Sequence, residues 1–266
     1  LVELPVSSLV EDTVAAEVAA AGGNAALFTM KAENGHLAYV SAEGWANYAK
    51  VTETDVTINK LIATCLSVNN DLYAVARVCC FKDDDTPYYY GRSNGLRDGN
   101  GNWRDETGSR WFSPASQGAR DYIIGICREV ADLGFDEIWL DYCFFPADGR
   151  TDRILRGDAY NDDTLTGDLE EFYRQLREAL ADDYPELKIS MTVAPDLRKG
   201  LVSLSSGQSW ELLGAYADLV YMGPGEIAPE DPFFPPGGEA SRWFSYEDVV
   251  WFGRENPPEN AGRVLP

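Results

Sequence analysis

Short apolar segments rich in β-branched and aromatic residues alternate along the chain with segments of helical periodicity. The apolar segments predict six β-strands, with a seventh beginning near the end of the chain: residues 2–6, 25–30, 72–81, 137–142, 189–193, 219–222 and 263–265. Between several of them, apolar residues recur at a spacing of 3.6 and predict helices within residues 14–21, 58–66, 119–133 and 169–180. We place the start of the third helix at Ser113-Pro114 and the cap of the fourth at Thr166.

Alternation of strands and helices predicts βαβ units and a parallel sheet. The strand count favours a TIM (β/α)8 barrel truncated at its C-terminus, so we expect residues 1–266 to form a single, incomplete barrel domain. The length agrees, because barrels of this kind run to about 250 residues. A doubly wound sheet is the alternative, but no Gly-rich phosphate loop follows the first strand, and Gly22-Gly23 precedes a strand instead.

Three long polar segments each follow a predicted strand, at residues 83–113, 147–163 and 223–241. In a barrel these loops lie at the carboxyl ends of the strands, where the active sites of this fold are built. Long loops are uncommon unless they are functional or disordered. Aromatic residues in the first of them, Trp103, Trp111 and the tyrosines at 88–90, suggest a surface that stacks on a ligand.

Composition removes several classes of function. The chain has 44 acidic and 22 basic side chains, a net charge of −22 that argues against nucleic acid or an anionic membrane as a partner. With His36 as the only histidine, no multi-His metal site can form, and a Ser-His-Asp triad has one possible base. No run of about 18 apolar residues is present, so we expect no membrane span.

Two further sets of residues have a structural interpretation. The five cysteines are interpreted as small buried hydrophobes rather than as a disulfide framework. The acidic clusters at residues 83–85 and 158–163 could bind calcium, but neither matches an EF-hand loop, and a solvated surface is favoured. We therefore expect no metal and no organic cofactor.

Asp141 is the main candidate for chemistry. It stands at the end of the predicted strand within residues 134–146, and a carboxylate there points into the barrel mouth, where it can act as nucleophile, base or acid. The alternative is that Asp141 only caps the following loop. Asp136 and Glu137 lie at the opposite end of the strand and are interpreted as solvent-facing or structural.

Residues 134–146, with Gly-Phe-Asp-Glu-Ile followed by Asp-Tyr and Phe-Pro, resemble the signature of the putative glycoside hydrolase domain family, TIM barrels related to the α-amylase-like hydrolases. Further resemblances follow in the same order along most of the chain, at residues 24–35, 76–83, 103–114 and 207–222. The chain departs from the family pattern at Thr29, where an acidic residue is common, and at Phe144, where an arginine is common. The resemblance implies a barrel and cleavage of glycosidic bonds.

Glycosidic cleavage generally needs two carboxyl groups, and two residues are candidates for the partner of Asp141. Asp196 follows the predicted strand at residues 189–193, and the resemblance to the α-amylase layout supports this pair; capping of the turn at 194–196 is the alternative. Glu226 follows the sixth predicted strand, in a Pro- and Gly-rich loop. A proton donor at neutral pH would need a raised pKa.

Several residues are candidates for binding substrate. Lys31 and Arg77 lie in or at the end of strands and Lys82 follows one, so we expect each of them to meet a carboxylate. Lys31 and Arg77 either position Asp141 or a sugar hydroxyl, or form structural ion pairs. Glu33 is a weaker candidate in the turn after Lys31. Tyr142, Trp103 and Trp111 are candidate stacking platforms for pyranose rings, together with Trp243 and the tyrosines at 88–90.

These inferences predict a glycoside hydrolase that acts on an oligo- or polysaccharide, with Asp141 as nucleophile or transition-state stabiliser and Asp196 or Glu226 as acid. The alternatives are a non-catalytic carbohydrate-binding barrel of a cell-surface protein and a barrel that binds a protein partner. We expect a bacterial protein that is secreted or held in the cell envelope. The sequence starts at Leu1 without Met or signal peptide, as expected for an excised or processed segment.

Overall fold

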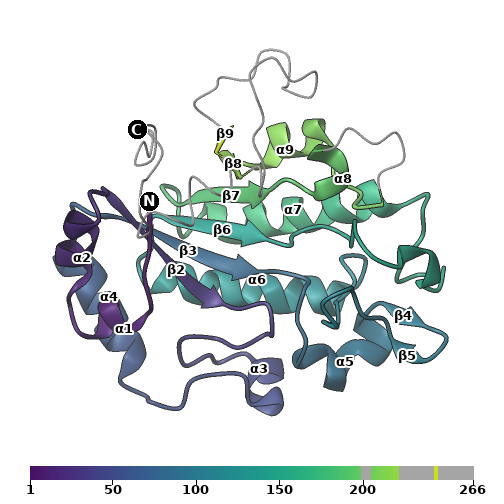
Figure 1. Ribbon diagram of the computed structural model, residues 1–266, viewed down its shortest axis with the longest axis horizontal. Helices are drawn as coiled ribbons and strands as arrows, with labels where there is room; N and C mark the ends of the chain where they lie inside the picture. Colours follow the sequence, from purple (N-terminus) through teal and green to yellow (C-terminus); the bar gives the residue numbers. More distant parts are fainter. Residues whose placement is uncertain (199–204, 222–242, 245–266) are drawn as a thin grey trace.

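A parallel sheet forms the centre of the computed structural model, which describes residues 1–198, 205–221 and 243–244 (Figure 1). Its strand order is β1-β2-β3-β6-β7-β8-β9, and every neighbouring pair is parallel. The strands are β1 (Val2–Glu3), β2 (Ala25–Lys31), β3 (Tyr73–Cys79), β6 (Glu137–Asp141), β7 (Lys188–Thr192), β8 (Leu219–Tyr221) and β9 (Trp243–Phe244). A separate antiparallel pair consists of β4 (Arg97–Asp98) and β5 (Gly101–Asn102).

Helices occupy the connections between the parallel strands. They are α1 (Ser7–Val10), α2 (Val14–Ala20), α3 (Gly44–Ala49), α4 (Ile58–Val68), α5 (Thr86–Asn94), α6 (Gln117–Asp132), the 3-10 turn η1 (Thr151–Arg153), α7 (Leu165–Ala181), α8 (Pro195–Arg198) and α9 (Trp210–Tyr216). Figure 1 shows α1, α2 and α4 near the amino ends of the strands, whereas α3, α5 and the β4–β5 pair lie beyond their carboxyl ends.

The predicted alternation of strands and helices is confirmed for the described residues. Six predicted strands are present, and they pair in the order in which they occur along the chain, as expected for successive βαβ units. The short helices α1, α3, α5, α8 and α9 were not predicted. The sheet continues with β9 at Trp243–Phe244, a strand that the apolar pattern did not predict, while the predicted strand at 263–265 lies outside the described residues.

The predicted start of α6 is wrong by a few residues. The side chain of Ser116, not Ser113, accepts a hydrogen bond from Ala119 N, so the helix begins at Gln117. Ser113 instead donates its hydroxyl to the carbonyl of Ala159. Both serines precede the same apolar periodicity, and tertiary contacts decide which of them caps the helix. Likewise α7 begins at Leu165, so Thr166 lies inside the helix rather than at its cap.

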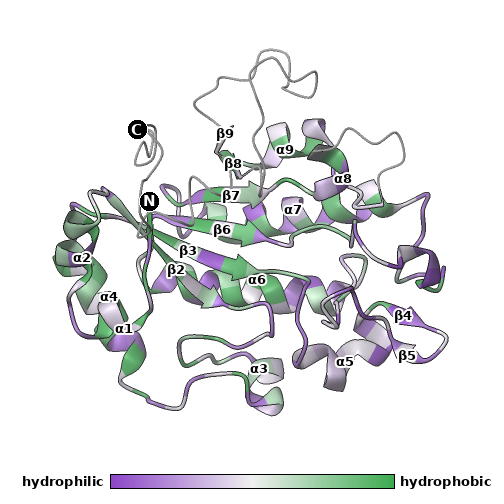
Figure 2. Ribbon diagram, viewed as in Figure 1, coloured by the Kyte–Doolittle hydropathy of each residue, from purple (hydrophilic) through white to green (hydrophobic). Residues whose placement is uncertain are grey.

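The face of the sheet that packs against the helices is apolar, and Figure 2 shows the hydrophobic colour along its strands. Phe28, Ala76, Leu140 and Met191 on successive strands belong to one buried cluster with apolar side chains of the connecting helices. Burial of this continuous apolar surface is the main source of stability for the fold. The apolar spacing found in the sequence for strands and for helices follows from the burial of these faces.

The opposite face of the sheet, called here the inner face, is concave and partly polar. Glu137 on β6 is buried there and accepts hydrogen bonds from the hydroxyls of Tyr73 on β3, Ser190 on β7 and Tyr221 on β8, at 2.9, 2.5 and 2.8 Å. Side chains of β3 and β8 can reach the same carboxyl group only if the sheet curls around it. Burial raises the pKa of Glu137, although the three hydroxyl donors oppose the shift. Glu137 is therefore structural, as one of the two interpretations of the sequence predicted.

Candidate active site at the carboxyl edge of the sheet

Asp141 ends β6 on the inner face and is almost completely buried. Its Oδ2 accepts hydrogen bonds from Arg77 Nε and Nη2 at 2.8 and 2.5 Å. Its Oδ1 accepts from the hydroxyl of Thr192 at 2.8 Å and from the backbone N–H of Tyr142 at 2.9 Å. A carboxylate has about four acceptor positions, so the protein supplies a donor for each and holds a charged group at this edge.

Arg77 connects two carboxylates. It lies on β3, beside β6, and its Nη2 also reaches Glu33 Oε1 at 3.2 Å, while its guanidinium lies 5.6 Å from the ring centre of Trp139. Arg77 thus contacts Asp141 directly, as both interpretations of the sequence, a positioning residue or a structural ion pair, require. The paired charge also explains how a guanidinium can be buried on the inner face.

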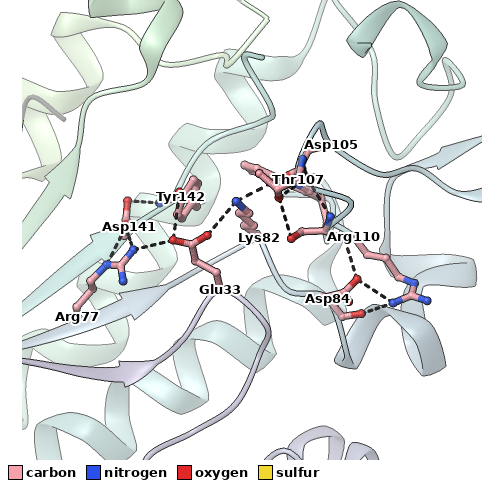
Figure 3. Close-up of polar contacts among 11 residues, drawn as sticks. Glu33, Arg77, Lys82, Asp84, Asp105, Thr107, Arg110, Asp141 and Tyr142 are labelled. Atoms are coloured by element: carbon pink, nitrogen blue, oxygen red, sulfur yellow. Dashed lines mark hydrogen bonds and ion pairs between the residues drawn. The ribbon is translucent and has the colours of Figure 1, made fainter. Parts of the chain in front are cut away.

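Glu33 lies in the turn after β2 and is the more accessible of the two carboxylates, with a side chain 41% exposed. Lys82 Nζ lies 2.9 Å from its Oε2, and the hydroxyl of Tyr142 donates to its Oε1 at 3.3 Å (Figure 3). Burial raises the pKa of Glu33, but hydrogen bonds and charge from Lys82 and Arg77 outweigh it, so that the pKa is lowered. Glu33 is therefore ionised at neutral pH.

Lys82 joins the site to the long loop after β3. Its Nζ also approaches Asp105 Oδ2 at 3.5 Å, and this oxygen accepts a hydrogen bond from Trp111 Nε1 at 3.0 Å. The other oxygen of Asp105 accepts from the backbone N–H groups of Thr107 and Ser109, each at 2.9 Å. We call Glu33, Arg77, Lys82, Asp105 and Asp141 the carboxylate cluster.

The distance between the Asp141 and Glu33 carboxylates is compatible with a catalytic pair, but the charge of Glu33 is not. Arg77 Nη2 lies 2.5 Å from Asp141 Oδ2 and 3.2 Å from Glu33 Oε1. These two oxygens are therefore at most about 6 Å apart, a limit that leaves room for the roughly 5–5.5 Å typical of retaining glycosidases. Such a pair needs one protonated member, however, and the lowered pKa of Glu33 leaves that residue ionised. Glu33 is suited to binding or charge stabilisation and not to proton donation.

Tyr142 has a left-handed backbone at the centre of the site, with φ 48°. Such a conformation costs a non-glycine residue about 1–3 kcal/mol unless its surroundings hold it. Here its N–H binds Asp141, and its carbonyl accepts from Phe81 N at 3.1 Å. Its ring lies 4.8 Å from Lys82 Nζ and remains half-buried. Of the predicted stacking rings, Tyr142 is the one that the structure brings to Asp141 while leaving it partly open.

Lys31 is placed differently from the expectation that it binds substrate. Its side chain has no exposure, and its Nζ lies 2.9 Å from Asp83 Oδ2 and 2.8 Å from the carbonyl oxygen of Cys79. This is the structural ion pair that the sequence left open as the alternative. Asp83 also explains Gly35, which has φ 93° and whose missing Cβ would lie 2.2 Å from the Asp83 carboxylate.

Trp103 and Trp111 are buried, which corrects the expectation that they form open stacking platforms. Trp103 Nε1 donates to the carbonyl of Arg150 at 3.0 Å and so joins the two long loops that follow β3 and β6. Trp111 packs edge-on against Tyr142 at 5.7 Å between ring centres. Aromatic residues in a polar loop were read as surface, whereas here they form the loop's own core. The side chain of Trp243 lies outside the described residues.

Asp196 and Glu226 are not brought to the carboxylate cluster by any contact in the described part of the chain. Asp196 is buried in α8, and its oxygens accept hydrogen bonds from the backbone N–H groups of Leu197 and Ser206 at 2.8 and 2.9 Å. These contacts are those of the turn-capping alternative. Glu226 lies outside the described residues.

Thr192, Lys82 and Asp105 belong to the site but were not proposed for it. Thr192 carried a usable signal, because it occupies the last position of β7 on the inner face, beside the end of β6. His36, the one possible base of a Ser-His-Asp triad, is exposed and pairs with Asp85 at 3.0 Å.

In residues 1–198, 205–221 and 243–244, no group of three His, Cys, Asp or Glu side chains is arranged to hold a metal ion. None of the helices in this part of the chain combines the length and hydropathy required to traverse a lipid bilayer.

The model of the putative glycosyl hydrolase domain family matches residues 7–222, which is most of the chain, and the chain belongs to that family. The resemblance read from the sequence is thereby confirmed. No curated protein matches the chain.

One solved structure supports the fold, and the two given after it are weaker likenesses. The crystal structure of a hypothetical protein from Ruminiclostridium thermocellum is 22% identical with a TM-score of 0.58, over 72% of this chain and 96% of that one. The galactosidase domain of an alpha-galactosidase-sucrose kinase is 14% identical with a TM-score of 0.49, over 82% of this chain and 28% of that one. The cyclic alpha-maltosyl-(1→6)-maltose hydrolase from Arthrobacter globiformis is 15% identical with a TM-score of 0.48, over 82% and 46%. The chain thus spans less than half of the latter two.

Proposed function

We propose that this member of the putative glycosyl hydrolase domain family cleaves O-glycosidic bonds in an oligo- or polysaccharide at the carboxylate cluster. The observation that carries the proposal is the position of Asp141, a carboxylate at the carboxyl end of β6 that Arg77 joins to the accessible carboxylate of Glu33. Barrel enzymes place their catalytic groups at this edge of the sheet. The family match supports hydrolysis of glycosides as the reaction class.

The charge arrangement suits a transition state with positive character at the sugar ring. Asp141 acts as nucleophile or as the ionised group that stabilises this charge, and Arg77 orients it. Glu33, ionised and accessible, binds a sugar hydroxyl beside it. Tyr142 offers its half-open ring as one wall of the site.

The proton donor is assigned to Asp196 or Glu226, as the sequence predicted. The lowered pKa of Glu33 favours a donor other than Glu33, because a donor must hold its proton at neutral pH. The donor's amide variant should lower kcat by about 10²–10⁴-fold and remove the basic limb of the pH–rate profile. An aryl glycoside with a good leaving group should restore much of the loss, since its departure needs little protonation.

The test is release of reducing sugar from a panel of oligo- and polysaccharides, comparing Asp141→Asn with the parent protein. We expect the substitution to lower release by at least about 10²-fold. Asp136→Asn is the matched control, because it makes the same change at the opposite end of β6, where Asp136 accepts from Ala74 N. Release that survives Asp141→Asn, with the fold intact by circular dichroism, would refute the assignment.

A non-catalytic carbohydrate-binding barrel of a cell-surface protein is the second candidate. The observation that favours it is that protein donors already occupy the acceptor positions of Asp141, as they would in a purely structural group. Such a protein would bind a glycan without releasing sugar, and Asp141→Asn would leave its affinity unchanged.

We further propose that residues 1–266 belong to a single domain with the architecture of a TIM (β/α)8 barrel. The consecutive parallel strand order and the curled inner face support this architecture. Action on extracellular glycans fits a bacterial protein that is secreted or held in the cell envelope. Fractionation of the source cell followed by immunodetection tests the location.

A further inference from the structure

Three tyrosine side chains lie largely in solvent at one place on the surface. Tyr48 on α3 is 66% exposed, and Tyr88 and Tyr89 on α5 are 64% and 49% exposed. Among the Phe, Trp and Tyr side chains in the part of the chain that the structure describes, these three are the exposed ones. Single exposed apolar residues are ordinary, but a gathering of them marks an interaction site.

The three rings contact one another and form one surface, called here the tyrosine platform. Tyr48 and Tyr89 lie 5.4 Å apart between ring centres, and Tyr88 and Tyr89 lie 5.0 Å apart, both pairs edge to face. Mutual contact fixes the orientation of each ring, which lowers the conformational entropy lost when a ligand binds.

Packing of the core does not account for the platform. Trp45 and Tyr90, both half-buried, stack at 4.4 Å and join α3 to α5. Trp45 also contacts the buried rings of Phe112 and Tyr122 at 5.6 and 5.5 Å. These rings attach the two helices to the core, whereas Tyr48, Tyr88 and Tyr89 leave about half or more of their surface in water.

The platform continues the rim that carries the carboxylate cluster. Figure 1 shows α3 and α5 beyond the carboxyl ends of the strands. Arg110 lies 5.1 Å from the ring centre of Tyr88. It also lies 2.9 Å from Asp84, which follows Lys82 by two residues in the sequence (Figure 3). Asp85 N also donates to the carbonyl of Asn34, the neighbour of Glu33, at 3.1 Å. Polar groups thus connect the cluster to the platform along one edge.

We infer that the tyrosine platform binds a neutral polysaccharide chain as it extends away from the carboxylate cluster, an inference that rests on the proposed function. Pyranose rings present C–H faces that pack on the faces of aromatic rings, and tyrosine adds a hydroxyl for their polar edges. Arg110 and Asp84 lie beside Tyr88 and offer partners for sugar hydroxyls. The net charge of −22 disfavours a polyanion, and the occupant proposed here is a neutral glycan.

The test is affinity electrophoresis of the Asp141→Asn protein, which prevents turnover, in gels containing soluble starch, galactomannan, hydroxyethyl cellulose or polygalacturonate. We expect at least one neutral polysaccharide to retard the protein. Tyr88→Ala with Tyr89→Ala should raise the dissociation constant at least about 10-fold, while the corresponding Phe pair should keep the affinity because it keeps the rings. Tyr184→Ala, just before β7 and at the opposite end of the sheet, is the matched control and should bind unchanged.

Several results would overturn the inference. One is unchanged retardation of the Ala pair, with a normal melting curve. Another is retardation by polygalacturonate alone, or by none of the four. A parent dimer that the Ala pair converts to a monomer in sedimentation would make the platform a protein interface instead. Sugar release by the parent protein is measured separately, so the proposed hydrolase can stand when the platform fails.

Discussion

Replacement of Lys31 by Met tests what holds the carboxyl edge of the sheet together. Lys31 and Asp83 form an ion pair at 2.9 Å, and neither side chain is exposed. Methionine keeps the apolar stem but removes the charge and the donor to the Cys79 carbonyl. The Asp83 carboxylate then remains buried, with the backbone N–H of Thr86 at 2.9 Å as its remaining hydrogen-bond donor among the contacts described.

Removing one partner of a buried ion pair leaves a buried charge without compensation, which costs about 3–5 kcal/mol. We therefore expect Lys31→Met to lower the free energy of unfolding by that amount. Lys31→Met combined with Asp83→Asn should be less destabilised than Lys31→Met alone, because the second change removes the uncompensated charge. This recovery of stability by the second substitution distinguishes a broken ion pair from ordinary loss of packing, in which the two losses would add.

Urea unfolding followed by tryptophan fluorescence measures the free energy of unfolding of the single and the double variant. The single variant should lose about 1–2 M in its midpoint, since the free energy falls by a few kcal/mol per molar urea. Lys60→Met, on the exposed surface of α4, is the control and should stay within about 0.5 kcal/mol of the parent. A loss below about 1 kcal/mol for Lys31→Met would refute the reasoning. So would a double variant that loses as much stability as Lys31→Met and Asp83→Asn, each measured alone, lose together. An increase in KM without loss of stability would instead return Lys31 to the substrate site.

Three further predictions concern charge and burial. The lowered pKa of Glu33 stabilises the folded state above pH 4.5, and this contribution is lost as the pH falls through the lowered pKa. In thermal melts, the stability difference between the parent and Glu33→Gln should therefore shrink below about pH 4.5. A constant difference would contradict the assignment. Burial raises the pKa of Glu137, so the parent loses stability as the pH rises from 4.5 through the raised pKa; Glu137→Gln should be free of this loss, and parallel pH profiles of the two proteins would argue against it. Burial raises the pKa of the Cys79, Cys127 and Cys143 thiols to about 12, and all five cysteines are buried and free; none should react with a disulfide reagent at about pH 8 before unfolding, whereas rapid native-state labelling would show that a thiol is open.

The backbone architecture was largely readable from the sequence. The apolar runs at 25–30 and 137–142 coincide with β2 and β6, because a strand buried on both faces needs a nearly continuous run of apolar residues. The periodic segments coincide with α6 and α7, because one face of each helix packs on the sheet. Their alternation determined the parallel pairing, since parallel neighbours need a crossover between them.

The site was only partly readable. Asp141 could be located because the end of a strand is a local property of the sequence. The partners of Arg77 could not be deduced in this way, because Asp141 and Glu33 lie 64 and 44 positions away. Burial of Trp103 and Trp111 was equally out of reach, since polar neighbours in sequence do not reveal which loop covers a ring.

The amino-acid sequence by itself therefore determined six of the parallel strands, the main helices, the parallel order and the family. The tertiary structure alone decided that Arg77 joins Glu33 to Asp141, that Lys82 pairs with Glu33, and that Lys31 pairs with Asp83. It also decided that three tyrosines gather in solvent. Local periodicity records which face of an element is buried. Which side chains meet at the edge depends on strand register, sheet curvature and loop packing, and these arise only when the distant segments come together.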